Sequence, residues 1–348
     1  MTADALQSAV RRLAFGQSLS ATESADAFGV IMSGEATASQ VAALLMALRV
    51  KGETADEVAG AARALRAAMI PIDAEEREAL VDTCGTGGGA VMTFNISTAA
   101  ALLAAGAGVR IAKHGNRSFT SKSGSADVLE AMGVPLDASA AVMSDVLRRA
   151  GVVFMFAPTL HPAMRHVGPV RRELGIPTVM NIVGPLANPA GAGRQVVGVA
   201  DKNRMPLLAG ALAALGSTHA LVVHGEPGMD EVSPVGPTHV AEIRNGTVTE
   251  WIIDPEKLGF NGIATDDLAG GDPATNARII EAVLEGKGPA GAEGAVLLNA
   301  AAAIYVSGMV STLDEALAKA LEALYSGAGR RALERLRQAY TAAKPAEL

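Results

Sequence analysis

The sequence predicts an α/β protein with a small N-terminal all-helical domain and a large α/β domain around a mixed, mostly parallel central sheet. Two observations lead to this prediction. Residues 1–70 repeat a helix-start pattern and contain no strand-like run of β-branched residues. From residue 80 onward, short strand-like runs alternate with helical stretches, and such alternation is typical of a parallel sheet covered by helices.

The helical part shows three capping-box spacings, in which a Ser or Thr is followed three residues later by Glu or Gln. These pairs are Ser20 with Glu23, Thr37 with Gln40 and Thr54 with Glu57. Pro71 ends this unit, so we expect domains at residues 1–70 and 71–348. A helical stretch within residues 162–185 lies between strand-like runs, and we expect it to join the first domain instead of covering the sheet.

The strands predicted for the large domain are residues 80–82, 109–113, 152–156, 195–200 and 220–224. Two further runs, residues 238–244 and 247–253, flank Asn245-Gly246, a dipeptide that favours a two-residue hairpin turn. We therefore expect at least one antiparallel pair beside the parallel strands.

Composition narrows the classes of function. Lys and Arg number 29 and Asp and Glu number 36, so the net charge of -7 disfavours nucleic-acid binding. The single cysteine, Cys84, excludes an internal disulfide and a four-ligand Cys/His zinc site, and it suggests a reducing compartment. Residues 1–10 lack a basic stretch followed by an apolar run, and no span of about 20 apolar residues occurs. We expect a cytoplasmic protein without a membrane segment.

Residues 82–98, DTCGTGGGAVMTFNIST, join a predicted strand to the start of a helix through a cluster of glycines. Glycines let backbone N–H groups approach an anion, and a helix N-terminus adds free N–H groups, so this segment predicts a phosphate site. A tight turn without a ligand is the alternative interpretation. The absence of Gly-Lys-Ser/Thr excludes a Walker A loop. The segment satisfies G-x-G-x-x-A, but the first acid after Ala90 is Asp127, which disfavours a dinucleotide site, although Arg110 keeps an NADP site as an alternative.

Three further segments carry candidate ligands. Residues 113–127, KHGNRSFTSKSGSAD, follow a predicted strand and would line the carboxyl edge of the same sheet. Residues 225–234, GEPGMDEVSP, carry the adjacent carboxylates Asp230 and Glu231, which suit a Mg2+ ion shared with substrate phosphates. Residues 161–181 contain Arg171 and Arg172, either of which could pair with a ligand carboxylate. Taken singly, each segment could also be a solvated polar stretch.

Taken together and in this order, KHGNRS, SGSADVLEAMG, NIVGPLANP and HGEPGMDEVSP resemble the anthranilate phosphoribosyltransferases. GGDPATNARII and AVLLNAAAAIYVSG extend the resemblance over nearly the whole chain. The resemblance implies a nucleoside phosphorylase/phosphoribosyltransferase-like fold with a hinge between its domains, and homodimerisation through the helical domain. It also implies Mg2+-dependent transfer of the 5-phosphoribosyl group of phosphoribosyl pyrophosphate to the amine of anthranilate, a step of tryptophan biosynthesis.

The resemblance also assigns site residues. For phosphoribosyl pyrophosphate it implies Gly85, Gly88, Gly89, Thr93, Asn95, Ile96, Ser97, Thr98, Lys113, His114, Gly115, Asn116, Arg117, Ser118, Phe119, Thr120, Ser121 and Ser125. For anthranilate it implies Gly85, Asn116 and Arg171, and for Mg2+ it implies Ser97, Asp230 and Glu231. Lys113 and Arg171 would carry catalysis. One position departs from the family pattern, because Gly89 stands where an Asp is usual and Ala90 stands where a Gly is common.

The expected chemistry is displacement at the ribose C1 carbon with inversion, in which negative charge builds on the departing pyrophosphate. Mg2+, Lys113 and backbone N–H groups around Gly88 and Ser97 would stabilise that charge. The arylammonium formed is acidic and needs no dedicated base, so His114 and His161 are expected only to line the substrate site. The alternatives are a pyrimidine nucleoside phosphorylase, an NADP oxidoreductase and a non-catalytic binding protein.

Overall fold

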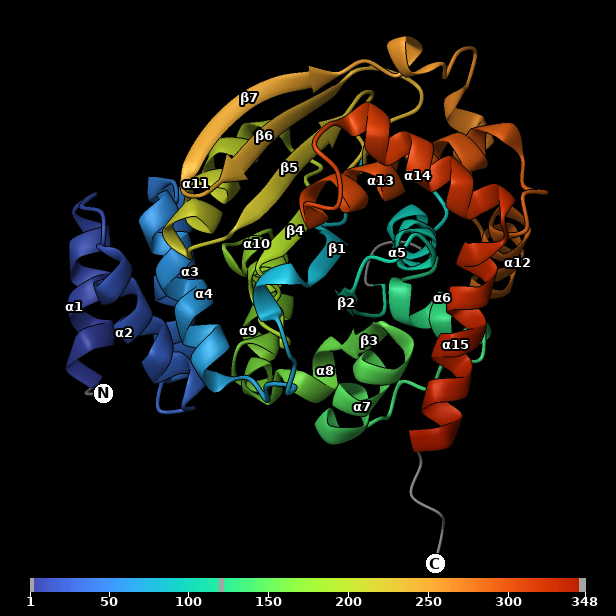
Figure 1. Ribbon diagram of the computed structural model, residues 1–348. Coiled ribbons are helices and arrows are strands. Elements are labelled where there is room, and N and C mark those ends of the chain that lie inside the picture. Colours follow the sequence, from blue (N-terminus) through green and yellow to red (C-terminus); the bar gives the residue numbers. More distant parts are fainter. Residues whose placement is uncertain (1–2, 119–121, 344–348) are drawn as a thin grey trace, which may run out of the picture.

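The computed structural model describes residues 3–118 and 122–343 and begins with a bundle of four helices (Figure 1). Their bounds are α1 (Ala3–Ala14), α2 (Ala21–Met32), α3 (Ala38–Lys51) and α4 (Ala55–Ala68). Helices α2, α3 and α4 each begin with a complete capping box, at Ser20, Thr37 and Thr54, as the sequence predicts. A cap of this kind satisfies N–H groups that have no partner inside the helix. The local sequence therefore fixes where these helices begin.

The rest of the chain is organised around a seven-stranded sheet with the order β3-β2-β1-β4-β5-β6-β7. The strands are β1 (Val81–Gly85), β2 (Ile111–Gly115), β3 (Val152–Phe156), β4 (Arg194–Gly198), β5 (His219–Gly225), β6 (Thr238–Arg244) and β7 (Thr247–Ile253). The first five in chain order run parallel, whereas β6 and β7 are antiparallel to their neighbours. The mixed, mostly parallel sheet is confirmed.

The turn between β6 and β7 has the geometry that its dipeptide predicts. Asn245 and Gly246 both have positive φ, at 50° and 80°. Arg244 and Thr247 pair directly on either side of them, so the loop is a two-residue hairpin.

Four strands differ from their predicted spans; β4 and β5 differ by one or two residues at each end, and β1 and β2 differ most. β1 continues to Gly85 because it pairs in register with β4 as far as Gly198, a long-range pairing that Cys and Gly residues do not indicate locally. β2 begins at Ile111 because the N–H of Val109 still donates to Ala104 O at 3.1 Å, at the end of the preceding helix. Both differences arise from hydrogen bonds to residues outside the strand itself.

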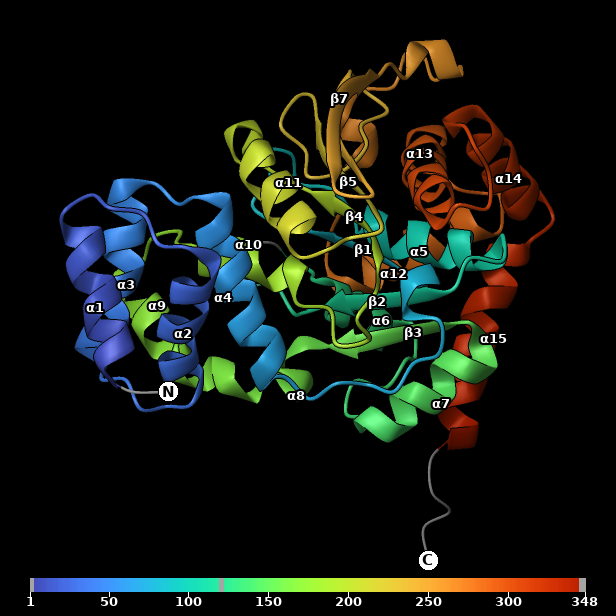
Figure 2. The same ribbon diagram turned by 60° about the vertical axis from the view of Figure 1, so that its left-hand side comes forward.

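Helices cover both faces of the sheet (Figure 2). One face packs against α5 (Ile96–Gly106) and α13 (Ala290–Ser307), with α15 (Ala328–Ala343) beside α5. The other face packs against α11 (Met205–Ala214), which also contacts α4 of the bundle. The other helices are α6 (Ser125–Ala131), α7 (Ala140–Ala150), α8 (Ala157–Leu160), α9 (Gly168–Leu174), α10 (Met180–Val183), α12 (Pro273–Leu284) and α14 (Leu313–Tyr325). Short 3-10 turns are η1 (Arg77–Ala79), η2 (Pro162–His166), η3 (Gly184–Leu186), η4 (Lys202–Arg204), η5 (Glu256–Leu258) and η6 (Thr265–Leu268).

Residues 162–185 form η2, α9 and α10, and these elements contact α2, α3 and α4 of the bundle. One apolar core lies between the sheet and the helices α5 and α13. A second core extends from the bundle through Val170 and Leu208 to Val222 on the opposite face of the sheet. The bundle, the 162–185 segment and this face of the sheet therefore share one continuous apolar interior.

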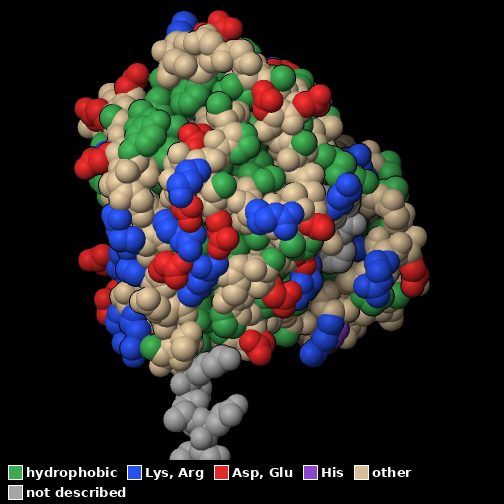
Figure 3. Space-filling view, turned by 90° about the vertical axis from the view of Figure 1, so that its right-hand side faces the viewer, with side chains coloured by type: hydrophobic (Ala, Val, Ile, Leu, Met, Phe, Trp, Pro, Cys, Tyr) green, Lys and Arg blue, Asp and Glu red, His purple; other side chains and the backbone are tan. Residues whose placement is uncertain are grey.

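Among the described helices, only α13 is long and apolar enough to cross a membrane, and 78% of it is buried inside the protein. A helix that is apolar on all sides and buried in this way belongs to the protein core. The outer face over α12 and α15 shows basic and acidic side chains next to each other (Figure 3). Ion pairs there include Arg337 with Glu281 and Arg330 with Glu285. Positive charge on this face is thus balanced by neighbouring acids.

Candidate active site

The glycine loop, residues 85–95, leaves the carboxyl end of β1 and leads into α5, which begins at Ile96. Gly87 and Gly88 have positive φ, at 69° and 80°, a conformation that favours glycine. The loop is held by its neighbours, because Thr86 N–H donates to Gly198 O at 2.9 Å and Ala90 N–H donates to Gly228 O at 2.9 Å. The carboxyl ends of β1 and β4 and the loop after β5 therefore meet at one edge of the sheet.

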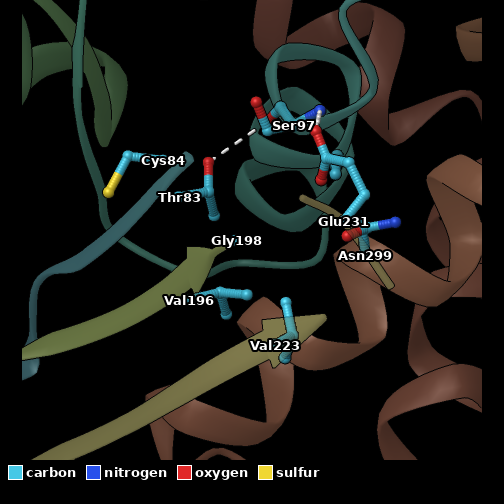
Figure 4. Close-up of a pocket in the computed structure, with 9 residues that line it drawn as sticks. Thr83, Cys84, Ser97, Val196, Gly198, Val223, Glu231 and Asn299 are labelled. Atoms are coloured by element: carbon cyan, nitrogen blue, oxygen red, sulfur yellow. Dashed lines mark hydrogen bonds between the residues drawn. The ribbon is translucent and has the colours of Figure 1, made fainter. Parts of the chain in front are cut away.

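The acidic loop, residues 226–237 between β5 and β6, brings two carboxylates against this glycine loop. Asp230 Oδ2 accepts a hydrogen bond from Gly87 N–H at 2.8 Å. Glu231 Oε1 accepts one from Ser97 N–H at 3.1 Å, in the first turn of α5 (Figure 4). The approach is close, since a Cβ at Gly198 would lie 1.7 Å from Asp230 O. Only glycine fits at the end of β4, and the sequence analysis did not identify this residue.

Burial acts on both carboxylates in the same direction. It raises the pKa of Asp230, and it raises the pKa of Glu231 to about 8, with the charge of Asp230 as a second cause. Such shifts mean that two negative charges are costly here without a cation. Ser97 lies beside Glu231, so the sequence-predicted metal ligands Ser97, Asp230 and Glu231 come together.

These three residues fit the ligand requirements of Mg2+. Within residues 3–118 and 122–343, no group of three His, Cys, Asp or Glu side chains could enclose a metal ion. The protein ligands offered at this site are therefore two carboxylates and one hydroxyl, and not a set of three acidic, His or Cys side chains. Mg2+ is commonly held in this way, by one or two carboxylates with substrate phosphates and water completing its octahedron.

Lys113 lies beneath the first turn of α5 with 4% of its surface exposed. Its ammonium donates to Thr83 O and, at 3.3 Å, to Ser97 Oγ. Burial lowers the pKa of Lys113, while the negative charges of Asp82 and Glu231 oppose that shift. The site therefore contains a buried cation between two groups of acids.

Asp82 is a site-supporting residue that the sequence analysis missed. Its Oδ1 accepts from His114 N–H at 3.0 Å, and its Oδ2 accepts from Asn188 Nδ2 at 2.7 Å. Burial raises the pKa of Asp82 to about 6. Only Val81 and Ile111 pair between β1 and β2, so the Asp82 carboxylate joins the strands where they diverge. An acid inside an apolar strand just before a glycine loop was the signal that could have revealed it.

Several side chains of residues 113–125 are held by neighbouring residues. Arg117 forms ion pairs with Asp127 at 2.7 Å and Glu130 at 2.8 Å, and its guanidinium lies 5.8 Å from the ring centre of Phe156. Ser118 N–H donates to Asp127 Oδ2 at 3.2 Å. Phe119, Thr120 and Ser121 lie outside the described residues. Asp127 thus holds this segment in place through Arg117 and the backbone of Ser118.

Asn116, Gly115 and Ser125 form the start of this loop. Ser125 Oγ donates to Asn116 O at 3.3 Å, and the Oδ1 of Asn116 accepts from Arg117 N–H at 2.7 Å. A Cβ at Gly115 would lie 2.2 Å from Ser125 Oγ, so these residues are packed closely. These contacts hold the end of β2 against the start of α6.

The remaining residues predicted for the phosphoribosyl donor differ in burial and in their hydrogen-bond partners. Asn95 is held by Ser123 O, which accepts from its Nδ2 at 3.1 Å, and by Asn276, which donates to its Oδ1 at 2.9 Å. The side chains of Ile96 and Thr98 are buried, and their backbone N–H groups donate to Phe94 O at 2.8 Å and to Asn95 O at 3.1 Å. Thr93 forms an isolated bridge with Ala269, and Gly85 ends β1 next to Asp230.

Among the residues predicted for anthranilate, Gly85 lies next to Asp230, whereas Arg171 lies beside the helical bundle. Arg171 stands on α9, which packs against α3 and η2, and its guanidinium makes no hydrogen bond or ion pair with any described residue. Burial lowers its pKa. His114 and His161 have ring centres 4.9 Å apart, and burial lowers their pKa values to about 3 and about 4. Both rings are therefore neutral near pH 7.

Comparisons with known proteins give a consistent result. Residues 7–69 match the helical bundle domain of a glycosyl transferase family, and residues 77–330 match its a/b domain. An anthranilate phosphoribosyltransferase of Rubrobacter xylanophilus is 51% identical, over 95% of this chain and 96% of the relative.

Two solved structures are similar along almost their full length. An anthranilate phosphoribosyltransferase of Thermus thermophilus has a TM-score of 0.90 and 41% identity, covering 96% of this chain and 99% of its own. That of Saccharomyces cerevisiae in complex with PRPP and Mg has a TM-score of 0.88 and 31% identity, covering 98% and 99%. With these matches in both sequence and fold, the chain belongs to the anthranilate phosphoribosyltransferase family.

Proposed function

We propose that this chain transfers the 5-phosphoribosyl group of phosphoribosyl pyrophosphate to the amine of anthranilate, releasing N-(5-phosphoribosyl)anthranilate and pyrophosphate for tryptophan biosynthesis. The observation that carries the proposal is the meeting of Asp230, Glu231 and Lys113 at the N-terminus of α5, beside the glycine loop. This is an anion site with its own means of holding a cation, at the sheet edge where α/β proteins bind ligands. Membership of the family supplies the identity of the two substrates.

Ser97, Asp230 and Glu231 would hold Mg2+, and a bound Mg2+ would neutralise charge on the pyrophosphate as it departs. The chain's own residues supply the rest of the anion site. Backbone N–H groups of the glycine loop around Gly88 and the N–H group of Ser97 would donate to phosphate oxygens, and Lys113 would place a positive charge near them. The N–H groups of Gly87 and Ser97 already donate to the carboxyl groups of Asp230 and Glu231, which supports their assignment as donors to phosphate oxygens.

Anthranilate would be oriented by residues other than those that hold the pyrophosphate. Arg171 has a partly buried guanidinium with no protein partner among the described residues, which suits it to bind the anthranilate carboxylate, with Asn116 and Gly85 as further contacts. The amine would then face the ribose C1 carbon from the side opposite the pyrophosphate, giving inversion. Holding both reactants in this way supplies about 7 kcal/mol or more of the barrier reduction.

No general base is assigned. His114 and His161 are neutral, but burial holds their pKa values at about 3 and about 4, far below that of an effective base at neutral pH. The arylammonium formed on C–N bond formation is strongly acidic and loses its proton to water or pyrophosphate. The two rings line the acceptor side of the site.

The helical bundle is the proposed dimer interface, and the cytoplasm is the proposed location. Phe15 and Val50 are 84% and 79% exposed at the ends of α1 and α3. They lie in the same region, because Lys51 Nζ donates to Ser18 Oγ. Two large apolar side chains exposed together favour a contact with a second copy of the chain.

The reaction is tested by following the fluorescence of anthranilate in the presence of protein, Mg2+ and phosphoribosyl pyrophosphate. The proposal expects fluorescence to fall only when all three are present, with release of one pyrophosphate per anthranilate consumed. Parallel reactions with phosphate and uridine test the nucleoside phosphorylase alternative. Consumption of uridine without consumption of anthranilate would overturn the proposal.

A further inference from the structure

Asn299 is a buried polar residue on α13 that binds the backbone of the acidic loop. Its Oδ1 accepts from Val232 N–H at 2.9 Å, and its Nδ2 donates to Val232 O at 2.8 Å. The same Nδ2 donates to Ala295 O at 2.9 Å within α13. One side-chain amide therefore holds both polar backbone groups of the residue that follows Glu231. Figure 4 draws Asn299 and Glu231 among the residues that line one pocket.

The backbone of the acidic loop needs such a partner. Residues 230–232 lie outside the strands, where no neighbouring strand satisfies their N–H and C=O groups, and Val232 is fully buried. A buried backbone N–H or C=O group without a hydrogen-bond partner destabilises the folded state. Asn299 supplies for Val232 what an adjacent strand would supply, and Thr238 Oγ1 does the same for Ser233 N–H at 2.9 Å.

Helix α13 is a fixed platform for this amide. Its C-terminal end is tied to the sheet, because Arg194 Nη1 donates to Val306 O at 2.6 Å and Tyr305 Oη donates to Glu242 Oε1 at 2.9 Å. Asn299 is itself 3% exposed, among Ala, Val and Leu neighbours along the helix. An amide in such surroundings is costly to bury unless it is used. Asn299 therefore holds the acidic loop at a fixed position relative to α13 and the core.

We infer that Asn299 is a positioning residue that sets where Asp230 and Glu231 stand, and through them how tightly the Mg2+ and phosphoribosyl pyrophosphate complex binds. The inference rests on the proposed function of the two carboxylates. Binding groups must stand within about 0.5 Å of their productive positions, and a misplacement of 1 Å can cost roughly 100-fold in activity. Release of Val232 would free the chain directly next to Glu231, while Arg171 on α9 would keep its place.

The test compares Asn299→Leu, which has a similarly branched side chain but removes both hydrogen bonds to Val232, with Tyr340→Phe as a matched control. Tyr340 on α15 donates from its hydroxyl to Phe154 O at 2.8 Å, a buried hydrogen bond made by a different helix to β3. Binding of phosphoribosyl pyrophosphate is measured by titration calorimetry at low and high Mg2+, with thermal unfolding and the KM of each substrate alongside. If Asn299→Leu does not fold, Asn299→Ser, which leaves room for a water to reach Val232, replaces it.

We expect the Asn299 variant to bind the donor tenfold or more weakly at low Mg2+ and to recover part of that loss at high Mg2+. The KM for anthranilate should change less than twofold, and Tyr340→Phe should lose thermal stability with donor binding unchanged. Unchanged donor binding in a folded Asn299 variant, or equal losses for both substrates, would overturn the inference. A wild-type protein that binds the donor with Mg2+ but does not consume anthranilate would refute the proposed reaction alone, because the calorimetric comparison at Asn299 still stands.

Discussion

The carboxylate of Asp230 lies 2.8 Å from the backbone nitrogen of Gly87. An acid from the loop after β5 thus accepts the hydrogen bond of an N–H group in the glycine loop after β1. Glu231 does the same at Ser97 N–H. The groups proposed to bind a cation thus cover groups proposed to bind phosphate. A cation that draws the carboxylates to itself would release those N–H groups for the phosphates of phosphoribosyl pyrophosphate. Binding of Mg2+ and binding of phosphoribosyl pyrophosphate should therefore be coupled.

The first prediction concerns this coupling. Asp230→Asn combined with Glu231→Gln should abolish turnover at low Mg2+, because the protein ligands of the cation lose their charge. Donor binding, measured by calorimetry with and without Mg2+, should strengthen with Mg2+ in the wild type and lose that dependence in the double variant. Glu226→Gln, in the same loop, is the control and should behave as the wild type. A double variant with the wild-type Mg2+ dependence would remove these residues from the metal site.

The second prediction concerns Arg171. Its guanidinium has no partner among the described residues, and a charged hydrogen bond contributes about 1.5–3 kcal/mol, so Arg171→Ala should raise the KM for anthranilate roughly 10- to 100-fold. The KM for the donor should change little. Arg172→Ala, at the next position of α9, is the matched control. Steady-state kinetics with each substrate varied decides the matter, and equal effects on both substrates would contradict the assignment.

The third prediction concerns Gly89, where the family usually has an Asp. Gly87 and Gly88 have positive φ but Gly89 does not, so an Asp there would meet no left-handed strain. Its Cβ would lie 3.1 Å from Gly228 O, a tight contact, and 3.4 Å from Asp230 Oδ1. Because a new carboxylate beside Asp230 would add a cation ligand, Gly89→Asp should lower the donor KM by about tenfold in the presence of Mg2+.

The matched variant at this position is Gly89→Ala, which introduces the same Cβ without the carboxylate. Donor KM values for the wild type and both variants at several Mg2+ concentrations separate the causes. Gain in the Asp variant alone identifies the missing contact. Equal harm in both variants would show that the Cβ itself is not tolerated against Gly228.

The fourth prediction concerns acid stability. Burial lowers the pKa of His161 to about 4, below its ordinary value of 6.5, so the unfolded chain binds the proton more tightly than the folded one. Stability should therefore fall as pH falls from 6.5 towards 4, with a contribution from His161 of about 1.4 kcal/mol per pH unit. His161→Gln should remove this contribution from urea unfolding curves recorded across that range. The same substitution at His166 serves as the control, and an unchanged slope in His161→Gln would refute the prediction.

The fifth prediction concerns the subunit contact. Phe15→Asp with Val50→Asp places charges on the two most exposed apolar side chains of the bundle and should convert a dimer to a monomer. Light scattering coupled to size-exclusion chromatography measures the mass directly. Tyr325→Asp, on a 72% exposed side chain of α14, is the control and should leave the mass unchanged. A double variant that remains dimeric would place the interface elsewhere.

The sequence by itself determined the starts of the bundle helices, the presence of the strands and their order along the chain, and the hairpin. Ser20, Thr37 and Thr54 define helix starts through hydrogen bonds to residues three positions away. Asn245 and Gly246 define the turn because both tolerate positive φ. Each of these features depends on interactions within a few residues, which is why a local pattern is sufficient to predict them. The meeting of the glycine loop and the acidic loop at one edge of the sheet was also predictable, since parallel strands end at the same edge.

Tertiary structure alone decided which partner each polar side chain takes. Asp82 binds Asn188, Asn299 holds Val232, and Arg117 turns to Glu130 although its motif suggested the donor site. The span of β1 up to Gly85 was likewise settled by its pairing with β4. The physical reason is that a buried polar group must find a partner wherever packing brings one within about 3 Å. That partner is chosen by the approach of distant segments, which no local spacing in the sequence encodes.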